Sequence, residues 1–119
     1  MNTPPQILHL NPAGLSQNPA FSQLVTVTGP VKTIYIGGQD ALDASGAIVG
    51  PGDLAAQTEQ VFHNLQIALG AAGAGLEHIV KWNIYLVQGQ PIQPAFEVFQ
   101  RLWGRRPDPP ARRRGRIVA

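Results

Sequence analysis

The alternation of apolar and polar residues predicts two amphipathic helices. Between Asp53 and Gly73, apolar side chains recur at three- and four-residue steps, the period of a helix with one buried face. Asp53 is a favoured N-cap residue, and Gly73 follows the last apolar position, where a glycine commonly ends a helix. A second helix is expected from Pro91, placed in its first turn, to Gly104. Each helix has one apolar face, which we expect to lie on a β-sheet.

Shorter apolar segments predict the strands of that sheet. Residues 24–28 and 33–36 flank Gly29-Pro30, an order that predicts a β-hairpin. A short strand is also expected near residues 7–10 and a longer one over residues 78–87. A last strand near the end of the chain is left open. Helices and strands in this order predict an α+β fold in which both helices cover one face of the sheet.

The strand expected over residues 78–87 is apolar on both faces. Three large side chains, Tyr35, Ile79 and Tyr85, fall on the parity that faces away from the helices, where a one-sided α+β layer leaves them in water. An apolar outer sheet face is typical of association surfaces, so we expect the chain to self-associate. The face expected to meet the helices carries Val80, Trp82, Ile84 and Leu86.

The composition narrows the class of protein. At 119 residues the chain fits one domain with one core, and its 44% hydrophobic content is too high for a disordered segment. It has no Cys, which excludes disulfides, thiolate metal sites and a Cys nucleophile. Zero Cys also fits a reducing compartment. We find neither an apolar run that could span a bilayer nor a secretory signal pattern, so we expect a cytoplasmic protein without a membrane segment.

Histidines and serines offer no catalytic or metal-binding pattern. The three His do not have the spacing of metal ligands, so no metal site is expected. Ser16, Ser22 and Ser45 lie outside any nucleophile-elbow pattern, which leaves a serine hydrolase unsupported. The glycines of residues 70–75 follow a helix rather than a strand, and we interpret them as a helix stop instead of a nucleotide-binding loop.

Positive charge is concentrated near the end of the chain. The net charge is +2, but residues 1–100 hold two basic and six acidic side chains (net −4), and residues 101–119 hold seven arginines and one aspartate (net +6). Residues 113–116, Arg-Arg-Gly-Arg, could form an electrostatic arm for phosphate backbones. No aromatic residues interleave with them, and the acidic body would repel nucleic acid. A solvated end is therefore favoured over an RNA-binding one.

Six motifs along the chain carry a family resemblance. They are Gly37-Gly38-Gln39-Asp40-Ala41-Leu42-Asp43, Gly50-Pro51-Gly52-Asp53-Leu54-Ala55-Ala56-Gln57-Thr58, Asn64-Leu65, Ala71-Ala72-Gly73-Ala74, Val80-Lys81-Trp82-Asn83-Ile84-Tyr85-Leu86, and Arg106-Pro107 followed by Pro110-Ala111-Arg112. Together they resemble the YjgF-like reactive-intermediate deaminase (Rid) family over roughly residues 10–112. The combination is specific, whereas no single piece of it is.

The resemblance implies a chorismate-mutase-like α+β fold of the bacillus type, and a homotrimer with ligand clefts between subunits. The best-known activity of the family is the hydrolysis of 2-enamines and 2-imino acids, released by pyridoxal-phosphate enzymes, to 2-keto acids and ammonia. No metal or organic cofactor is used. Other members have been described as endoribonucleases or translation inhibitors. The implied partners are a small 2-imino or 2-keto carboxylate and further copies of the chain, rather than nucleic acid or a membrane.

The resemblance also implies a set of site residues. Arg112 matches the essential arginine of the family, whose guanidinium fork binds the substrate carboxylate and orients the imine for attack by water. Gly38 matches a glycine whose backbone lines the cleft. Phe21 stands where many members have a tyrosine, Gly37 where serine is common, and Gln90 where an asparagine precedes the second helix.

The chain departs from the family pattern after Arg112. In the family this arginine opens a strand, and a further strand follows with an acidic residue that positions the attacking water. Here seven residues follow Arg112, none of them acidic, and residues 113–116 make a poor strand interior. We therefore expect one Rid-like domain over residues 1–119, an atypical basic tail over residues 113–119, and the loss of the last family strand.

Three functions remain open at this point. The first is Rid-like hydrolysis of enamines and imines, impaired by the missing acidic strand. The second is a trimer that binds small carboxylates without catalysis. The third is an RNA-interacting protein of the endoribonuclease or translation-inhibitor type, which would use its arginine-rich end.

Overall fold

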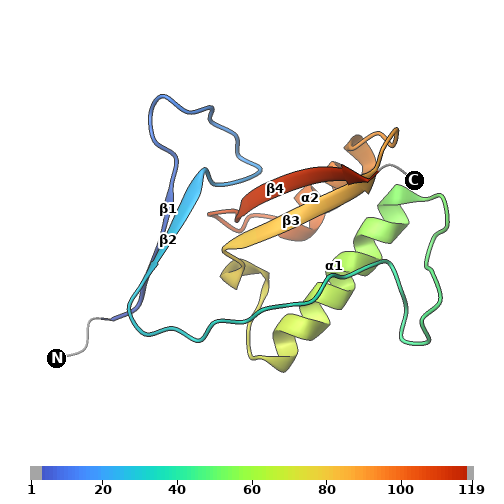
Figure 1. Ribbon diagram of the computed structural model, residues 1–119, viewed down its shortest axis with the longest axis horizontal. Helices are drawn as coiled ribbons and strands as arrows, with labels where there is room; N and C mark the ends of the chain where they lie inside the picture. The colour runs from blue at the N-terminus through green and yellow to red at the C-terminus, as the bar shows by residue number, and fades with distance from the viewer. Residues whose placement is uncertain (1–3, 118–119) are drawn as a thin grey trace.

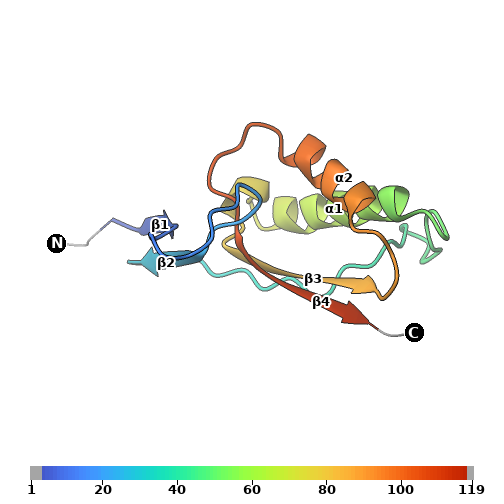
Figure 2. The same ribbon diagram turned by 90° about the horizontal axis from the view of Figure 1, so that it is seen from above.

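A computed structural model describes the backbone of residues 4–117 and the side chains of residues 4–112. It confirms the α+β class. Figures 1 and 2 show both helices on one face of the sheet formed by β3 and β4, while the β1–β2 ribbon lies to one side. The elements in chain order are β1 (Gln6–Leu10), β2 (Leu24–Thr28), α1 (Leu54–Ala71), a short 3-10 helix η1 (Leu76–His78), β3 (Lys81–Val87), α2 (Gln93–Trp103) and β4 (Ala111–Ile117).

Helix α1 begins and ends where the sequence predicts. The Asp53 carboxylate accepts a hydrogen bond from the Ala56 N–H at 3.1 Å, which satisfies one of the free amides of the first turn. Gly73 has a φ of +76°, and the N–H groups of Gly73 and Ala74 bond carbonyls of the last turn at 3.0 and 2.9 Å. This pair of bonds is the Schellman arrangement that a glycine at this position permits.

Helix α2 begins later than predicted. It starts at Gln93, so Pro91 precedes the helix and Pro94 occupies the first turn. A proline there costs no helical hydrogen bond, because the N–H groups of the first turn have no partner within the helix. Gly104 ends α2 with a φ of +64°, as expected.

An aromatic cluster joins β3 to both helices. The Trp82 ring of β3 packs edge-on against Phe62 of α1 and Phe99 of α2, with centroids 5.7 and 5.6 Å apart. The ring centroid of Trp103 in α2 lies 6.0 Å from that of Trp82. Such edge-to-face pairs each add about 0.5–1.5 kcal/mol beyond their buried area. Burial alternates along β3, with Trp82 on the inner face, which confirms the predicted period of two.

The predicted hairpin between residues 24–28 and 33–36 is wrong. Strand β2 pairs antiparallel with β1, Thr28 lying opposite Gln6, and residues 33–36 have no strand assignment. The pairing partner of β2 is thus an earlier segment of the chain, β1, and not the segment that follows Gly29-Pro30. Which strands pair depends on long-range packing, which the local pattern does not report.

Residues 31–40 instead run beside α1 and are attached to it at two points. Lys32 donates from Nζ to the carbonyl of Ala72 at 2.5 Å, at the C-terminal end of the helix. Nearer its middle, the side-chain amide of Asn64 donates to the carbonyl of Asp40 at 3.1 Å. A cation at a helix C-terminus is favourable because the last carbonyls are unpaired and partly negative. The helix thereby fixes the path of this segment.

Strand β4 corrects the expectation that residues 113–116 cannot form a strand. Ala111–Ile117 pairs parallel with β3, with Lys81 opposite Ala111 and Val87 opposite Ile117. Strand propensity depends on context, and β3 offers an edge whose hydrogen bonds do not depend on side-chain type. The strand that the resemblance assigns to the arginine is therefore present. Residues 118–119 lie outside the described part of the chain.

Two of the three side chains predicted to be exposed are exposed, but only Tyr85 lies on a strand of the sheet, because residues 33–36 form none. Tyr35 is 93% and Tyr85 56% exposed. Ile79 packs against the buried core instead, because η1 interrupts the alternation and β3 starts only at Lys81. Within residues 4–117, neither helix has the length and apolarity needed to cross a membrane.

Candidate functional site

Arg112 and Phe21 are in direct contact. Arg112 is the second residue of β4, and its guanidinium carbon lies 4.6 Å from the centroid of the Phe21 ring. This is within the range of a cation–π interaction. Both residues are half-buried. The contact restricts the guanidinium to one face of the ring, and a planar, permanently charged fork held in this way is suited to bind a carboxylate through two parallel hydrogen bonds.

Ser22 links the segments that carry these two residues, a role that no sequence pattern indicates. Its N–H donates to the carbonyl of Pro110 at 3.2 Å, and its hydroxyl donates to the carbonyl of Pro109. His9 Nδ1 lies 3.0 Å from the same hydroxyl oxygen. Ser22 is only 2% exposed, which distinguishes it from the other serines. This burial is visible only in the folded chain.

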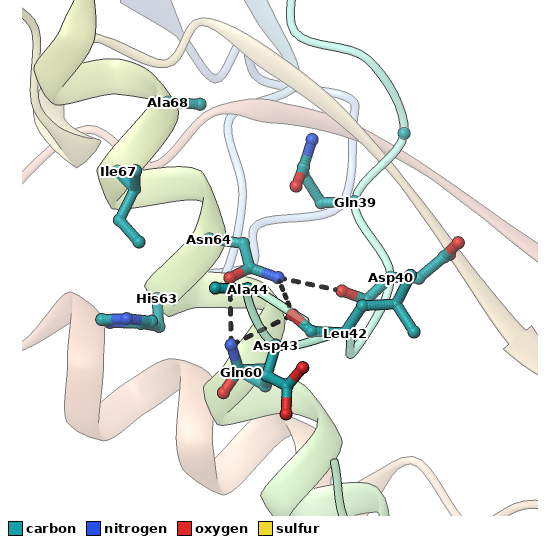
Figure 3. Close-up of a pocket in the computed structure, with 11 residues that line it drawn as sticks. Gln39, Asp40, Leu42, Asp43, Ala44, Gln60, His63, Asn64, Ile67 and Ala68 are labelled. Carbon is teal, nitrogen blue, oxygen red and sulfur yellow. Dashed lines mark hydrogen bonds between the residues drawn. The ribbon is translucent and has the colours of Figure 1, made fainter. Parts of the chain in front are cut away.

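Gly37 and Gly38 lie in the segment between β2 and α1. A methyl group added at either position would meet no atom within 4 Å. Within one chain, therefore, neither glycine is required by packing. Gly38 contributes to the lining of a hollow of about 670 Å³ between this segment and α1 (Figure 3).

Two amide side chains of α1 hold one wall of that hollow. Asn64 donates from Nδ2 to the carbonyls of Asp40 and Leu42, at 3.1 and 2.9 Å. Gln60 donates from Nε2 to Leu42 at 3.2 Å and to Asn64 Oδ1 at 3.0 Å, as the dashed lines in Figure 3 show. The helix thus sets the backbone that follows Gly38. The Asn64-Leu65 motif was a signal for this role, although Asn64 was not among the predicted site residues.

Asp43 lies on the same hollow, but its carboxylate is used by its own turn. It accepts hydrogen bonds from the Ser45 hydroxyl at 2.6 Å, the Ser45 N–H at 2.9 Å and the Ala47 N–H at 3.0 Å. The bond from the Ser45 hydroxyl, followed by that from Ala47, lowers the pKa of Asp43 below its ordinary value of 3.8. All three bonds go to Oδ1, and a carboxylate with a lowered pKa is a poor acceptor for a proton from water.

Other carboxylates also have structural partners. Glu59 pairs with Arg101 across the two helices. Glu77 lies 3.7 Å from Arg106, measured from Oε2 to Nε. Over the residues that the structure describes, no three His, Asp or Glu side chains come close enough to hold a metal ion.

Gln90 lies at the other end of the sheet from Arg112. Its N–H donates to the carbonyl of Val87 at 3.3 Å, in the turn that follows β3. Arg112 instead pairs in register with Trp82, near the start of β3. The five steps along the strand from Trp82 to Val87 span about 16 Å at about 3.3 Å each. One chain therefore brings Phe21 and Arg112 together but places Gln90 well away from them.

Comparison with known proteins places the chain among related sequences. A family model described as Endoribonuclease L-PSP matches residues 15–114. Protein DfrA of Myxococcus xanthus is 32% identical over 83 residues, 70% of this chain and 63% of that protein. The 2-iminobutanoate/2-iminopropanoate deaminase of Rattus norvegicus is 32% identical over 81 residues, 68% of this chain and 57% of that protein. The chain thus matches less than two thirds of the length of either relative.

Solved structures agree with the fold. The structure of YyfB from Yersinia pestis, described as a protein of unknown function of the conserved Rid family, has a TM-score of 0.81 and 31% identity, covering 95% of this chain and 86% of that one. The structure of yeast Mmf1 has a TM-score of 0.64 and 20% identity, covering 96% of this chain and 87% of the Mmf1 chain. At this identity the likeness supports the fold and nothing further.

Proposed function

This chain belongs to the endoribonuclease L-PSP family, which is the YjgF or Rid family, and we propose that it hydrolyses 2-enamines and 2-imino acids to 2-keto acids and ammonia. The observation that carries the proposal is the guanidinium of Arg112 held over the Phe21 ring, at 4.6 Å. The name of the rat relative, an iminobutanoate and iminopropanoate deaminase, supports the same substrate class.

In this reaction Arg112 binds the carboxylate of the imino acid, and Phe21 forms one wall of the site. Hydrogen bonds to charged groups contribute about 1.5–3 kcal/mol each, so a two-point contact fixes the orientation of the imine carbon. Water adds to that carbon and a proton moves to the nitrogen, which gives a carbinolamine. The carbon–nitrogen bond then breaks, ammonia leaves and the 2-keto acid remains. Arg112 stays protonated throughout, and Phe21 has no hydroxyl with which to exchange a proton.

We place this site between copies of the chain, in a homotrimer. Arg112 and Gln90 lie at opposite ends of the β3–β4 sheet, so one copy alone does not bring them to a substrate only a few atoms long. A second copy would supply the missing end. The exposed ring of Tyr85 on β3 and that of Tyr35 in the segment between β2 and α1 offer aromatic surface for association. The cytoplasmic location remains a prediction.

The alternative is a trimer that binds small carboxylates without turning them over. It is favoured by the engagement of Asp43, Glu59 and Glu77 with other parts of the fold, which leaves these carboxylates unsuited to position a water. The RNA-interacting alternative rests on the arginines near the end of the chain, against a body of net charge −4. Salt-dependent retention of RNA by the full chain would favour it.

The test is the release of 2-oxobutyrate from freshly generated 2-iminobutyrate. The unmodified chain should accelerate it, and Arg112→Ala should lower kcat/KM by at least tenfold. Arg105→Ala, which removes an exposed arginine outside the proposed site, is the control and should leave the rate unchanged. Equal rates for the unmodified chain and Arg112→Ala would remove Arg112 from the mechanism. Saturable binding of 2-oxobutyrate without any turnover would support the non-catalytic alternative instead.

A further inference from the structure

Ser22 is the one polar side chain found buried in residues 4–112, and it bonds both neighbouring segments of the site. Its main-chain N–H and its hydroxyl bond two successive carbonyls, those of Pro110 and Pro109. A single residue is therefore attached at two points to the segment that leads into Arg112. Phe21 is the residue directly before Ser22.

The hydroxyl of Ser22 is also bonded from the side of β1. A serine hydroxyl has one proton, and here that proton is donated to the carbonyl of Pro109. The contact of 3.0 Å to His9 must therefore be a bond that the hydroxyl oxygen accepts, with Nδ1 of the imidazole carrying the proton. Ser22 thus joins three parts of the chain: β1, the loop before β2, and the segment before β4.

The acceptor segment is stiff, so attachment to it fixes the position of Arg112. The rings of Pro109 and Pro110 restrict their φ angles, and Pro110 also restricts the ψ angle of Pro109, which sets the direction of the Pro109 carbonyl. The next residue, Ala111, donates its N–H to Val80 at 3.0 Å and so secures the start of β4 to the strand beside it. Attachments at Pro109 and Pro110 and at Ala111 therefore directly precede Arg112.

We propose that Ser22 is a positioning residue that holds the Phe21 ring beneath the Arg112 guanidinium. If the hydroxyl of Ser22 were removed, the loop that carries Phe21 would keep only the bond from the Ser22 N–H to the carbonyl of Pro110. The carbonyl of Pro109 and the imidazole of His9, which belong to half-buried residues, would each lose a hydrogen-bond partner. The proposal rests on the proposed function only for its effect on substrate, because the contact between Phe21 and Arg112 is observable without any substrate.

The experiment measures that contact and the kinetics in the same variants. The aromatic ring current of Phe21 shifts the Arg112 Nε–H resonance, which is assigned by its loss in Arg112→Lys. In Ser22→Ala this resonance should move toward the position of an exposed arginine, and the KM for 2-iminobutyrate should rise at least fivefold with a smaller change in kcat. Ser16→Ala, which removes an exposed hydroxyl from the same loop, should change neither.

Ser22→Cys keeps the shape of the side chain but replaces the hydroxyl with a weaker hydrogen-bond donor. It decides the question if Ser22→Ala does not fold. An intermediate resonance and an intermediate KM are expected. The proposal is overturned if a folded Ser22 variant leaves the Arg112 resonance and the KM as they are in the unmodified chain. Should the unmodified chain show no hydrolysis, the resonance alone decides: its displacement in Ser22→Ala supports the positioning role, although the proposed function would have failed.

Discussion

Arg112 and Phe21 come from distant parts of the sequence, and in the folded chain the guanidinium carbon of one lies 4.6 Å from the ring centroid of the other. The relationship depends on β4 pairing with β3, and on Ser22 joining the loop before β2 to the segment before β4. A cation confined in this way loses less conformational entropy when it binds an anion. This restriction supports the proposal that Arg112 binds a small carboxylate.

Replacing the aromatic ring tests the contribution of this contact. Phe21→Leu keeps an apolar wall but removes the cation–π interaction, worth about 0.5–1 kcal/mol at a partly exposed site. We expect the KM for 2-iminobutyrate to rise about two- to fivefold, because a loss of about 0.5–1 kcal/mol in binding free energy corresponds to a factor of that size. Phe21→Tyr keeps the ring and should retain the KM of the unmodified chain. Steady-state kinetics check this, and a KM unaffected by Phe21→Leu would show that the ring does not orient Arg112.

The side chain of Asn64 should stabilise the segment that follows Gly38. Asn64→Ala removes two hydrogen bonds to main-chain carbonyls, and each contributes about 0.5–1.5 kcal/mol. We expect the free energy of unfolding to fall by about 1–2 kcal/mol and amide exchange to accelerate between Gly38 and Leu42. Denaturant unfolding and hydrogen exchange measure the two effects. Gln66→Ala, on an exposed part of the same helix, serves as the control, and exchange rates that match in both variants would argue against the predicted role.

The turn around Asp43 should weaken in acid. The hydrogen bond from Ser45 lowers the pKa of Asp43 below 3.8 in the folded chain, so the ionised form is favoured by folding. This contribution to stability is fully present above the unfolded pKa and is lost as the pH falls through the folded one. The carboxyl resonance should titrate below pH 3.8, and Asp43→Asn should remove this part of the acid dependence. A carboxyl group that titrates at or above 3.8 would contradict the prediction.

Self-association should depend on the outer face of the sheet. Tyr85 is 56% exposed on β3, and a charge at this position would be costly in an apolar interface. We expect Tyr85→Lys to convert the trimer to a smaller species in light scattering and to reduce imine hydrolysis in parallel. Gln66→Lys adds the same charge on α1 and should leave the trimer intact. If the unmodified chain is already a monomer, the shared site proposed above is wrong.

Local features of the fold were predictable from the sequence, and strand pairing was not. The ends of α1 follow from the cap at Asp53 and the glycine at Gly73, both of which act within one turn of the helix. The partner of β2 could not be predicted, because pairing reflects competition between distant segments. For β4, the open edge of β3 outweighed a sequence of low strand propensity.

The candidate site was predictable only in part. The resemblance identified Arg112 and Phe21, which the structure brings into contact, but it did not indicate that Gln90 lies at the far end of the sheet. Ser22 lies outside any nucleophile-elbow pattern, and its spacing indicates no structural role. Its role depends on burial and on two proline carbonyls far along the chain, neither of which can be inferred from spacing.

The most direct test of the central claim compares Arg112→Lys with the unmodified chain in the hydrolysis of 2-iminobutyrate. Lysine keeps the positive charge but lacks the planar fork that binds a carboxylate at two points. The account predicts that kcat/KM falls at least tenfold, with 2-oxobutyrate binding weakened to a similar extent. Equal kcat/KM values for Arg112→Lys and the unmodified chain would contradict it, because orientation by a two-point guanidinium contact would then play no part in the reaction.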